Sequence, residues 1–150
     1  MNQKVWHKNY DPGLPYHLDL PEIPVNRLLE DRAAAMPDGT ACTILGRTYT
    51  YRRINQKANL LAHALLNWGL SIGDRVAVIM GNSPSFISCQ YGILKAGGTV
   101  VPVNPLYTGR EMSHILSDCA ARLAVVHSRF AGQVAAIMNK TGLEKLIVAP

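Results

Sequence analysis

Ser83 is the first residue whose type and position could do chemistry, because it lies on a predicted turn from a strand into a helix. Residues 81–85 read GNSPS, which is close to the G-x-S-x-G turn that exposes a nucleophilic serine in hydrolases. The last glycine is absent, and nothing in the sequence ties His114 or His127 to Ser83 as a general base. Since Pro84 suits the first position of a helix, we predict instead that Ser83 is a helix cap.

Three other stretches have part of the chemistry of an anion site. Gly97 and Gly98 follow a predicted helix instead of preceding one, so we interpret them as a helix stop with close backbone packing. Residues 141–145 (TGLEK) lack the run of small residues typical of a phosphate loop. Arg52 and Arg53 lie in the first turn of a predicted helix, where free N–H groups could help them to hold an anion. We expect two solvated side chains there rather than an anion site.

The cysteines and the charge exclude two classes of function. Cys42, Cys89 and Cys119 are widely spaced and form no CxxC pair, so we expect core thiols in a reducing compartment and no metal site. The net charge is +5, but the basic residues are scattered, and we expect no nucleic-acid partner. No apolar run could span a bilayer, and residues 1–20 lack the apolar core of a signal peptide. We therefore expect a cytoplasmic protein, with peripheral membrane contact as an alternative.

A regular alternation of strands and helices must position these residues. Candidate strands cover residues 76–80, 99–101, 122–126 and 145–149, at intervals of about 23 residues, which fits one strand, one helix and two loops. Helices are expected up to about Ala96, from Thr108 behind a Thr108–Glu111 capping box, and from Ser128. Pro102 and Pro105 are expected to end the second strand. This pattern predicts an α/β fold with a largely parallel sheet and flanking helices.

The first half of the chain supplies the remaining elements. Residues 25–35 are predicted to form a helix, and residues 40–45 and 48–50 a small β-hairpin. A helix then starts at Thr50-Tyr51 and carries one apolar stripe, which consists of Ile54, Ala58, Leu61, Leu65 and Trp68. Residues 1–24 contain four prolines and are predicted to form an extended arm. Its aromatic residues favour docking onto residues 25–150, a further domain or a second subunit.

Two segments carry a resemblance to a known family. Residues 94–104 read LKAGGTVVPVN, and residues 104–112 read NPLYTGREM. These stretches resemble the LKAGxxxVP(I/V)(D/N) and NPxYTxxEL segments of the acyl-adenylate-forming enzymes, the second in its fatty-acid-CoA ligase form. TYTY at residues 48–51 and NLLA at residues 59–62 resemble the TYxEL…NxLA segment of the same family, although Arg53 replaces an acidic residue.

The resemblance implies a function for a longer parent protein. It implies the N-terminal subdomain of the large domain of an acyl-CoA synthetase, which joins a medium- or long-chain fatty acid to CoA through an acyl-adenylate. ATP, Mg²⁺ and CoA would serve the parent enzyme, and the remaining domains of that enzyme would be partners. The family's (Y/F)TSGTTGxPK loop and catalytic lysine are absent here, so we expect no catalytic residue, no bound cofactor and no activity in these 150 residues.

Within this interpretation, two residues could face the substrates. Tyr107 and Arg110 follow a predicted strand, and the carboxyl ends of parallel strands are where ligands collect. They are candidates to face an acyl or CoA path, although a structural turn is the role we expect. Two alternatives stay open for the whole chain. One is a stand-alone α/β module that binds a nucleotide or small ligand, and the other is a non-catalytic piece that dimerises through its arm or an exposed apolar face.

Overall fold

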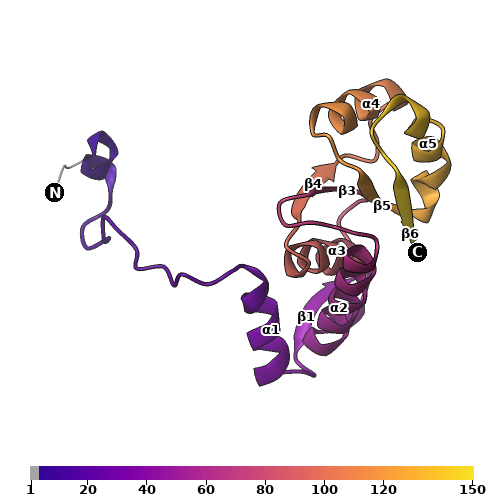
Figure 1. Cartoon of the computed structure of the whole chain (residues 1–150). Coiled ribbons are helices and arrows are strands. Elements are labelled where there is room, and N and C mark those ends of the chain that lie inside the picture. Colours follow the sequence, from indigo (N-terminus) through magenta and orange to yellow (C-terminus); the bar gives the residue numbers. More distant parts are fainter. Residues whose placement is uncertain (1–3) are drawn as a thin grey trace.

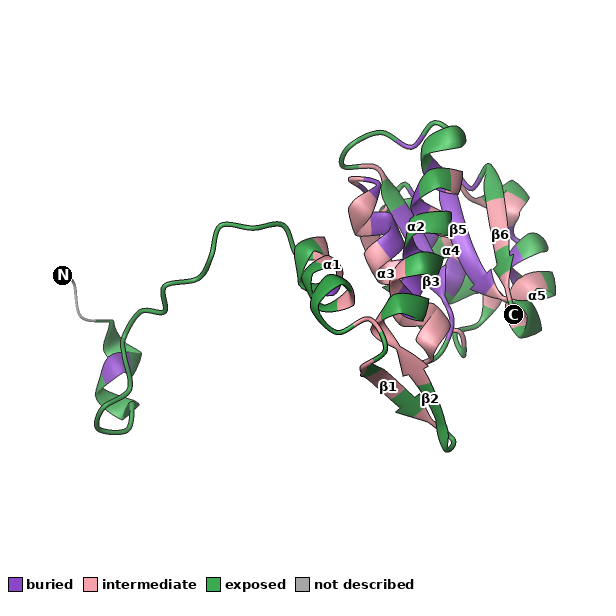
Figure 2. Ribbon diagram, turned by 90° about the horizontal axis from the view of Figure 1, so that it is seen from below, coloured by how far each residue is buried: buried purple, intermediate pink, exposed green. Residues whose placement is uncertain are grey.

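The computed structural model describes residues 4–150 and confirms the predicted α/β architecture (Figure 1). A four-stranded parallel sheet contains β3 (Arg75–Ile79), β4 (Thr99–Val103), β5 (Leu123–His127) and β6 (Lys145–Ala149), in the spatial order β4-β3-β5-β6. β3 and β5 occupy its centre and are almost completely buried, because their side chains are apolar on both faces (Figure 2).

Helices cover both faces of the sheet. On one face lie α2 (Tyr51–Asn67) and α3 (Pro84–Lys95), whose apolar residues pack on alternate residues of the strands. On the other face lie α4 (Gly109–Asp118) and the short α5 (Ala131–Ala135). Each strand therefore divides its apolar side chains between two cores, as the alternation of side chains along a strand requires.

Helix α1 (Asn26–Ala35) packs outside α2 and α3, and a two-stranded antiparallel hairpin follows it. The hairpin consists of β1 (Thr40–Ile44) and β2 (Arg47–Thr50), which are joined by Leu45 and Gly46. Both joining residues have positive φ values, 48° and 74°, as in the tight turns that connect twisted strands. The turn is thus one residue earlier than residues 46–47, which lie between the two strands predicted from the sequence.

Strand β4 corrects one sequence-based expectation. We expected Pro102 to end the strand, but the strand continues through Pro102 to Val103, in register with Val78 and Ile79 of β3. The reason is the position of β4 at the edge of the sheet, where a proline can occur without removing a hydrogen bond of a central ladder.

The helix expected from Ser128 is also different. It is divided into a 3-10 turn (η2, Ser128–Phe130), α5 and a second 3-10 turn (η3, Met138–Lys140). The cap of η2 is the His127 side chain, which accepts a hydrogen bond from the Arg129 N–H, so Ser128 is not the cap. The apolar residues still reach the core, because Val134 and Ile137 are buried beneath α4.

The N-terminal arm extends away from the α/β unit, on the side opposite to the C-terminus (Figures 1 and 2). It is not extended throughout, because a 3-10 turn, η1 (Val5–Asn9), forms before the first proline. The buried His7 ring stacks on Tyr16 at a centroid distance of 4.4 Å, which closes a small aromatic cluster. Docking of the arm onto residues 25–150, one of three expected arrangements, is therefore not what the structure shows.

Candidate functional site

A mostly apolar cavity of about 520 Å³ lies at the carboxyl edge of the sheet. It is formed by the loops that follow β3 and β4, together with Phe86 of α3 and Phe130 of η2. From β3 the chain passes to β4 on one side and then to β5 on the other, so the cavity lies where the strand order reverses. This is the position at which open α/β sheets bind ligands.

The lining of this cavity decides what it can hold. Its apolar members are Met80, Phe86, Pro102, Val103, Pro105, Leu106 and Phe130. Asn82 and Asn104 are the polar side chains of the lining, and no charged residue contributes to it. The cavity therefore suits a hydrocarbon group better than a phosphate.

The structure separates Tyr107 and Arg110 from this cavity. Neither residue lines it, whereas the neighbouring Leu106 does, and all three side chains are exposed. The Tyr107 carbonyl accepts a hydrogen bond from Gln133 Nε2 at 2.8 Å, and Asn104 Oδ1 accepts one from the Leu106 N–H at 3.0 Å. The local contacts are those of a structural turn, and a role of Tyr107 or Arg110 on a substrate path stays a prediction.

The helix caps agree with the sequence. Ser83 Oγ accepts a hydrogen bond from the Phe86 N–H at 3.1 Å, as expected of a helix cap. Thr108 and Glu111 form the expected capping box, with Glu111 Oε2 accepting from the Thr108 N–H at 2.8 Å. This hydrogen bond is the main reason why the pKa of Glu111 lies below its usual value.

The glycine pair also has the expected structural role. Gly97 has a φ of 81° and stops α3, and a side chain on Gly98 would come within 3.2 Å of the Asp74 carbonyl. Neither glycine lies before a helix, where a phosphate loop would require it. The pair therefore packs the end of α3 against the sheet.

The two arginines of α2 are exposed to solvent, as expected, and each also has a partner within the fold. Arg52 Nε and Nη2 donate to the two carboxylate oxygens of Asp38 at 3.2 and 3.0 Å. The Arg53 guanidinium lies over the Tyr49 ring, 5.3 Å from its centroid. Thr50 Oγ1 accepts a hydrogen bond from the Arg53 N–H and so caps α2. An acidic side chain at position 53, as in the family pattern, would accept a hydrogen bond from the Thr50 N–H in return and complete a capping box. The arginine side chain has no acceptor and cannot do so. Both arginines are thus engaged within the fold.

The cysteines are free thiols, and Cys89 is deeply buried. Burial raises the pKa of the Cys89 thiol to about 11, and the charge of Lys57 opposes this rise only in part. Within residues 4–150, no group of three or more His, Cys, Asp or Glu side chains could hold a metal ion. In the same part of the chain, no helix is long and apolar enough to cross a membrane.

The pKa of Cys89 leads to a prediction about its reactivity. At pH 8 only about one Cys89 in a thousand is a thiolate, so iodoacetamide should label Cys89 at least about tenfold more slowly in the folded chain than in denaturant. The rate should rise as the pH approaches 11, because the thiolate is the nucleophile. Peptide mass mapping after timed labelling measures the rate at which Cys89 reacts. Equal rates in the folded and the denatured chain would contradict the prediction.

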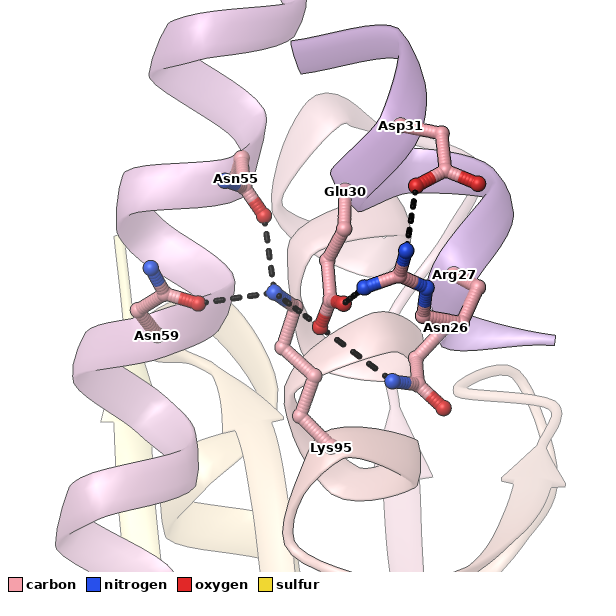
Figure 3. Close-up of polar contacts among 7 residues, drawn as sticks. All are labelled: Asn26, Arg27, Glu30, Asp31, Asn55, Asn59 and Lys95. Atoms are coloured by element: carbon pink, nitrogen blue, oxygen red, sulfur yellow. Dashed lines mark hydrogen bonds and ion pairs between the residues drawn. The ribbon is translucent and has the colours of Figure 1, made fainter. Parts of the chain in front are cut away.

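A largely buried lysine, which the sequence analysis did not single out, joins three helices (Figure 3). The Lys95 side chain at the end of α3 is only 9% exposed, and its Nζ lies 2.9 Å from Glu30 Oε1 on α1. It also donates to Asn55 Oδ1 and Asn59 Oδ1 on α2, both at 2.8 Å. The three oxygens thus match the three N–H donors of the ammonium group. The pKa of Glu30 is lowered, mainly because its carboxylate accepts a hydrogen bond from Lys95.

Part of this network had a signal in the sequence. Asn55 and Asn59 are four residues apart, so they share one face of α2. Asn59 and Lys95 both belong to segments on which the family resemblance rests. These residues join α1, α2 and α3 and face no cavity of the carboxyl edge, so their role is to hold the helices together.

The comparisons with known proteins agree with this geometry. The family model described as AMP-binding enzyme matches residues 29–149. A long-chain-fatty-acid-CoA ligase of Bacillus subtilis is 41% identical over 125 residues, which are 83% of this chain and 22% of that protein. The ligase of the same name from Yersinia pestis is 35% identical over 149 residues, which are 97% of this chain and 26% of that protein.

A solved structure shows the same fold. The long-chain-fatty-acid-CoA ligase of Archaeoglobus fulgidus has a TM-score of 0.82 and 27% identity, over 93% of this chain and 30% of that one. The 150 residues thus span about a quarter of the length of the curated relatives.

Proposed function

Because this chain belongs to the AMP-binding enzyme family, we propose that it is the N-terminal part of a fatty-acid-CoA ligase. In the proposed reaction of the whole protein, a carboxylate attacks the α-phosphate of ATP and releases pyrophosphate. The CoA thiol then attacks the acyl carbonyl, and AMP leaves. The family match over residues 29–149, together with relatives named as long-chain-fatty-acid-CoA ligases, is the observation that carries this proposal.

We propose a division of labour within that protein. The carboxyl-edge cavity of this part has no charged lining and fits a hydrocarbon chain, so it would supply one wall of the acyl site. The phosphate loop of the family is absent from these residues, and no group of three or more His, Cys, Asp or Glu side chains within residues 4–150 could hold a metal ion. ATP, Mg²⁺ and CoA would therefore be held mainly by the remainder of the protein. The expected cytoplasmic location stays a prediction, as does a medium- or long-chain substrate.

The proposal predicts where activity resides. The 150-residue chain should release no pyrophosphate from ATP, Mg²⁺ and any fatty acid, because it lacks the phosphate loop. The full-length product of the same gene should release pyrophosphate and form acyl-CoA with a long-chain acid. Enzyme-coupled pyrophosphate detection measures the first step in both proteins, and chromatographic detection of acyl-CoA measures the second step. Turnover by the 150 residues alone, or no acyl-CoA from a folded full-length protein, would refute the assignment.

The role of the cavity is tested separately in the full-length protein. Leu106 lies at the open rim of the cavity, with 82% of its surface exposed. Leu106→Trp adds a larger side chain at this rim and should raise the KM for long acids at least about fivefold, with less effect on short acids. Leu45→Trp is the control, because Leu45 is 97% exposed on the hairpin turn. An unchanged chain-length preference in Leu106→Trp would exclude the cavity from the acyl site and leave the ligase assignment intact.

A further inference from the structure

A second cavity, of about 260 Å³, lies at the amino edge of the sheet, at the starts of β3 and β5. Trp68 and Leu70 line it from the loop after α2, and Arg75 and Arg122 line it from the starts of the two strands. β3 and β5 are the central strands, and each has a neighbouring strand on both sides. A strand added at either edge of the sheet would therefore be separated from this amino-edge cavity by β4 or β6.

Two arginines lie side by side at this cavity. Val76 and Leu123 are neighbours in the parallel ladder of β3 and β5. Arg75 and Arg122 precede them by one residue each, so they belong to adjacent strands, which are about 4.8 Å apart, and to the same face of the sheet. Two like charges so placed repel each other unless an anion lies near them.

Only one of the two arginines has its anion. Arg122 Nε and Nη2 donate to the two carboxylate oxygens of Glu144 at 2.8 and 3.0 Å. Arg75 has no ion-pair partner within residues 4–150. The cavity is thus bordered by an unpaired guanidinium group beside a paired one. The planar fork of an arginine matches the oxygens of a phosphate group, which makes phosphate the anion that this position suits best.

The rest of the lining fits the other groups of a nucleotide. Trp68 offers an aromatic ring on which a base can stack. Lys145, which does not line the cavity, holds this ring in place: its Nζ lies 5.3 Å from the ring centroid and donates to the Trp68 carbonyl at 3.3 Å. Asp74 also lines the cavity, and its Oδ2 accepts a hydrogen bond from the Ser71 N–H at 2.9 Å. Its Oδ1 is left as an acceptor for a hydroxyl group.

We propose that the amino-edge cavity binds a nucleoside monophosphate. The phosphate would lie at Arg75 and Arg122, the base on Trp68, and a ribose hydroxyl would donate to Asp74. Small-molecule sites usually measure about 300 to 1,000 Å³, so a cavity of about 260 Å³ suits a monophosphate and is too small for CoA. The strands separate this cavity from the carboxyl edge, and the inference does not depend on the ligase function.

The two tryptophans of the chain provide the test, because each gives one indole N–H signal in a ¹H–¹⁵N NMR spectrum. AMP is the probe, since the proposed ligase reaction releases it. Titration of the 150-residue chain with AMP should shift the Trp68 signal, with a dissociation constant of about 1 mM or lower, and leave the Trp6 signal of the arm unchanged. Trp6→Phe assigns the two signals. Adenosine and inorganic phosphate should each bind at least about tenfold more weakly, because each lacks part of the contacts.

Arg75→Gln should weaken AMP binding at least about tenfold. This arginine is chosen because its removal leaves no carboxylate unpaired, whereas loss of Arg122 would free Glu144. Arg47→Gln, at an exposed arginine of the hairpin, is the matched control and should bind AMP like the unmodified chain. The amide signals of the same spectra verify that both variants are folded.

Three results would overturn the proposal. The first is no shift of the Trp68 signal at AMP concentrations up to about 10 mM. The second is equal affinity in the Arg75→Gln and Arg47→Gln variants, which would exclude the arginine pair as the phosphate site. The third is inorganic phosphate binding as tightly as AMP, which would exclude a site for the nucleoside. None of these results bears on acyl-CoA formation by the full-length protein, which is measured separately.

Discussion

Replacement of Lys95 by methionine should lower the free energy of unfolding by about 2 to 3 kcal/mol. Methionine keeps most of the length of the side chain but removes the ammonium group that joins Glu30, Asn55 and Asn59. The cost arises because a partly buried carboxylate and two amide oxygens lose their donor together. Urea unfolding followed by circular dichroism measures the change, and Lys140→Met, at an exposed lysine, is the control for removal of one charge.

A double-mutant cycle with Glu30→Gln separates the ion pair from the rest of the network. The pKa of Glu30 is lowered in the folded state, so the stability that it contributes is present above its unfolded pKa. This contribution disappears as the pH falls through the folded pKa. The difference between Glu30→Gln and the unmodified chain should therefore vanish in strong acid. A Lys95→Met variant as stable as the Lys140→Met control would show that the network does not hold the helices.

Replacement of Gly92 by alanine should destabilise the chain by about 2 kcal/mol, although alanine is the better helix former. A Cβ atom on Gly92 would lie 2.8 Å from the Ala58 carbonyl oxygen and 3.0 Å from the Leu61 Cβ. The first contact is with backbone, so α2 itself would have to move away from α3. In a chain of this size, 2 kcal/mol corresponds to a fall in Tm of roughly 4 to 8 °C.

Gly132 offers a matched control for this substitution. It also lies within a helix, but a Cβ atom there would meet nothing within 4 Å. Gly132→Ala should therefore be neutral or stabilising by up to about 1 kcal/mol, as intrinsic helix propensity predicts. Scanning calorimetry of the two variants measures both effects. Equal shifts in Tm would show that the close approach of α2 and α3 is not what requires Gly92.

Several polar interactions of the fold could not be predicted from the sequence. Arg52 and Asp38 are 14 residues apart and meet only because the hairpin returns the chain to the start of α2. Lys95 meets residues that lie 36 and 40 positions earlier in the chain. No local pattern in the sequence indicates contacts over such separations, and a lysine two residues before a glycine pair is typical of an ordinary helix end.

In the candidate site, too, the sequence predicted the position of a loop but not the side chains that line the cavity. The sequence placed Tyr107 just beyond the carboxyl end of a strand, and in the structure Tyr107 lies in the loop between β4 and α4. The cavity is instead lined by Leu106, together with Phe86 and Phe130 from elements that the sequence did not connect to it. Which residue of a loop borders the cavity depends on the turn that Asn104 closes with the Leu106 N–H, and such details are not encoded in apolar periodicity.

The sequence by itself determined the order of strands and helices after residue 75, the caps at Ser83 and Thr108, and the family. These depend on side-chain periodicity and on contacts between near neighbours, which the order of residues contains directly. The tertiary structure alone decided the strand order, the tolerance of Pro102 in an edge strand and the Lys95 network. Each of these requires segments distant in the chain to meet, so it exists only once the helices and the sheet have packed.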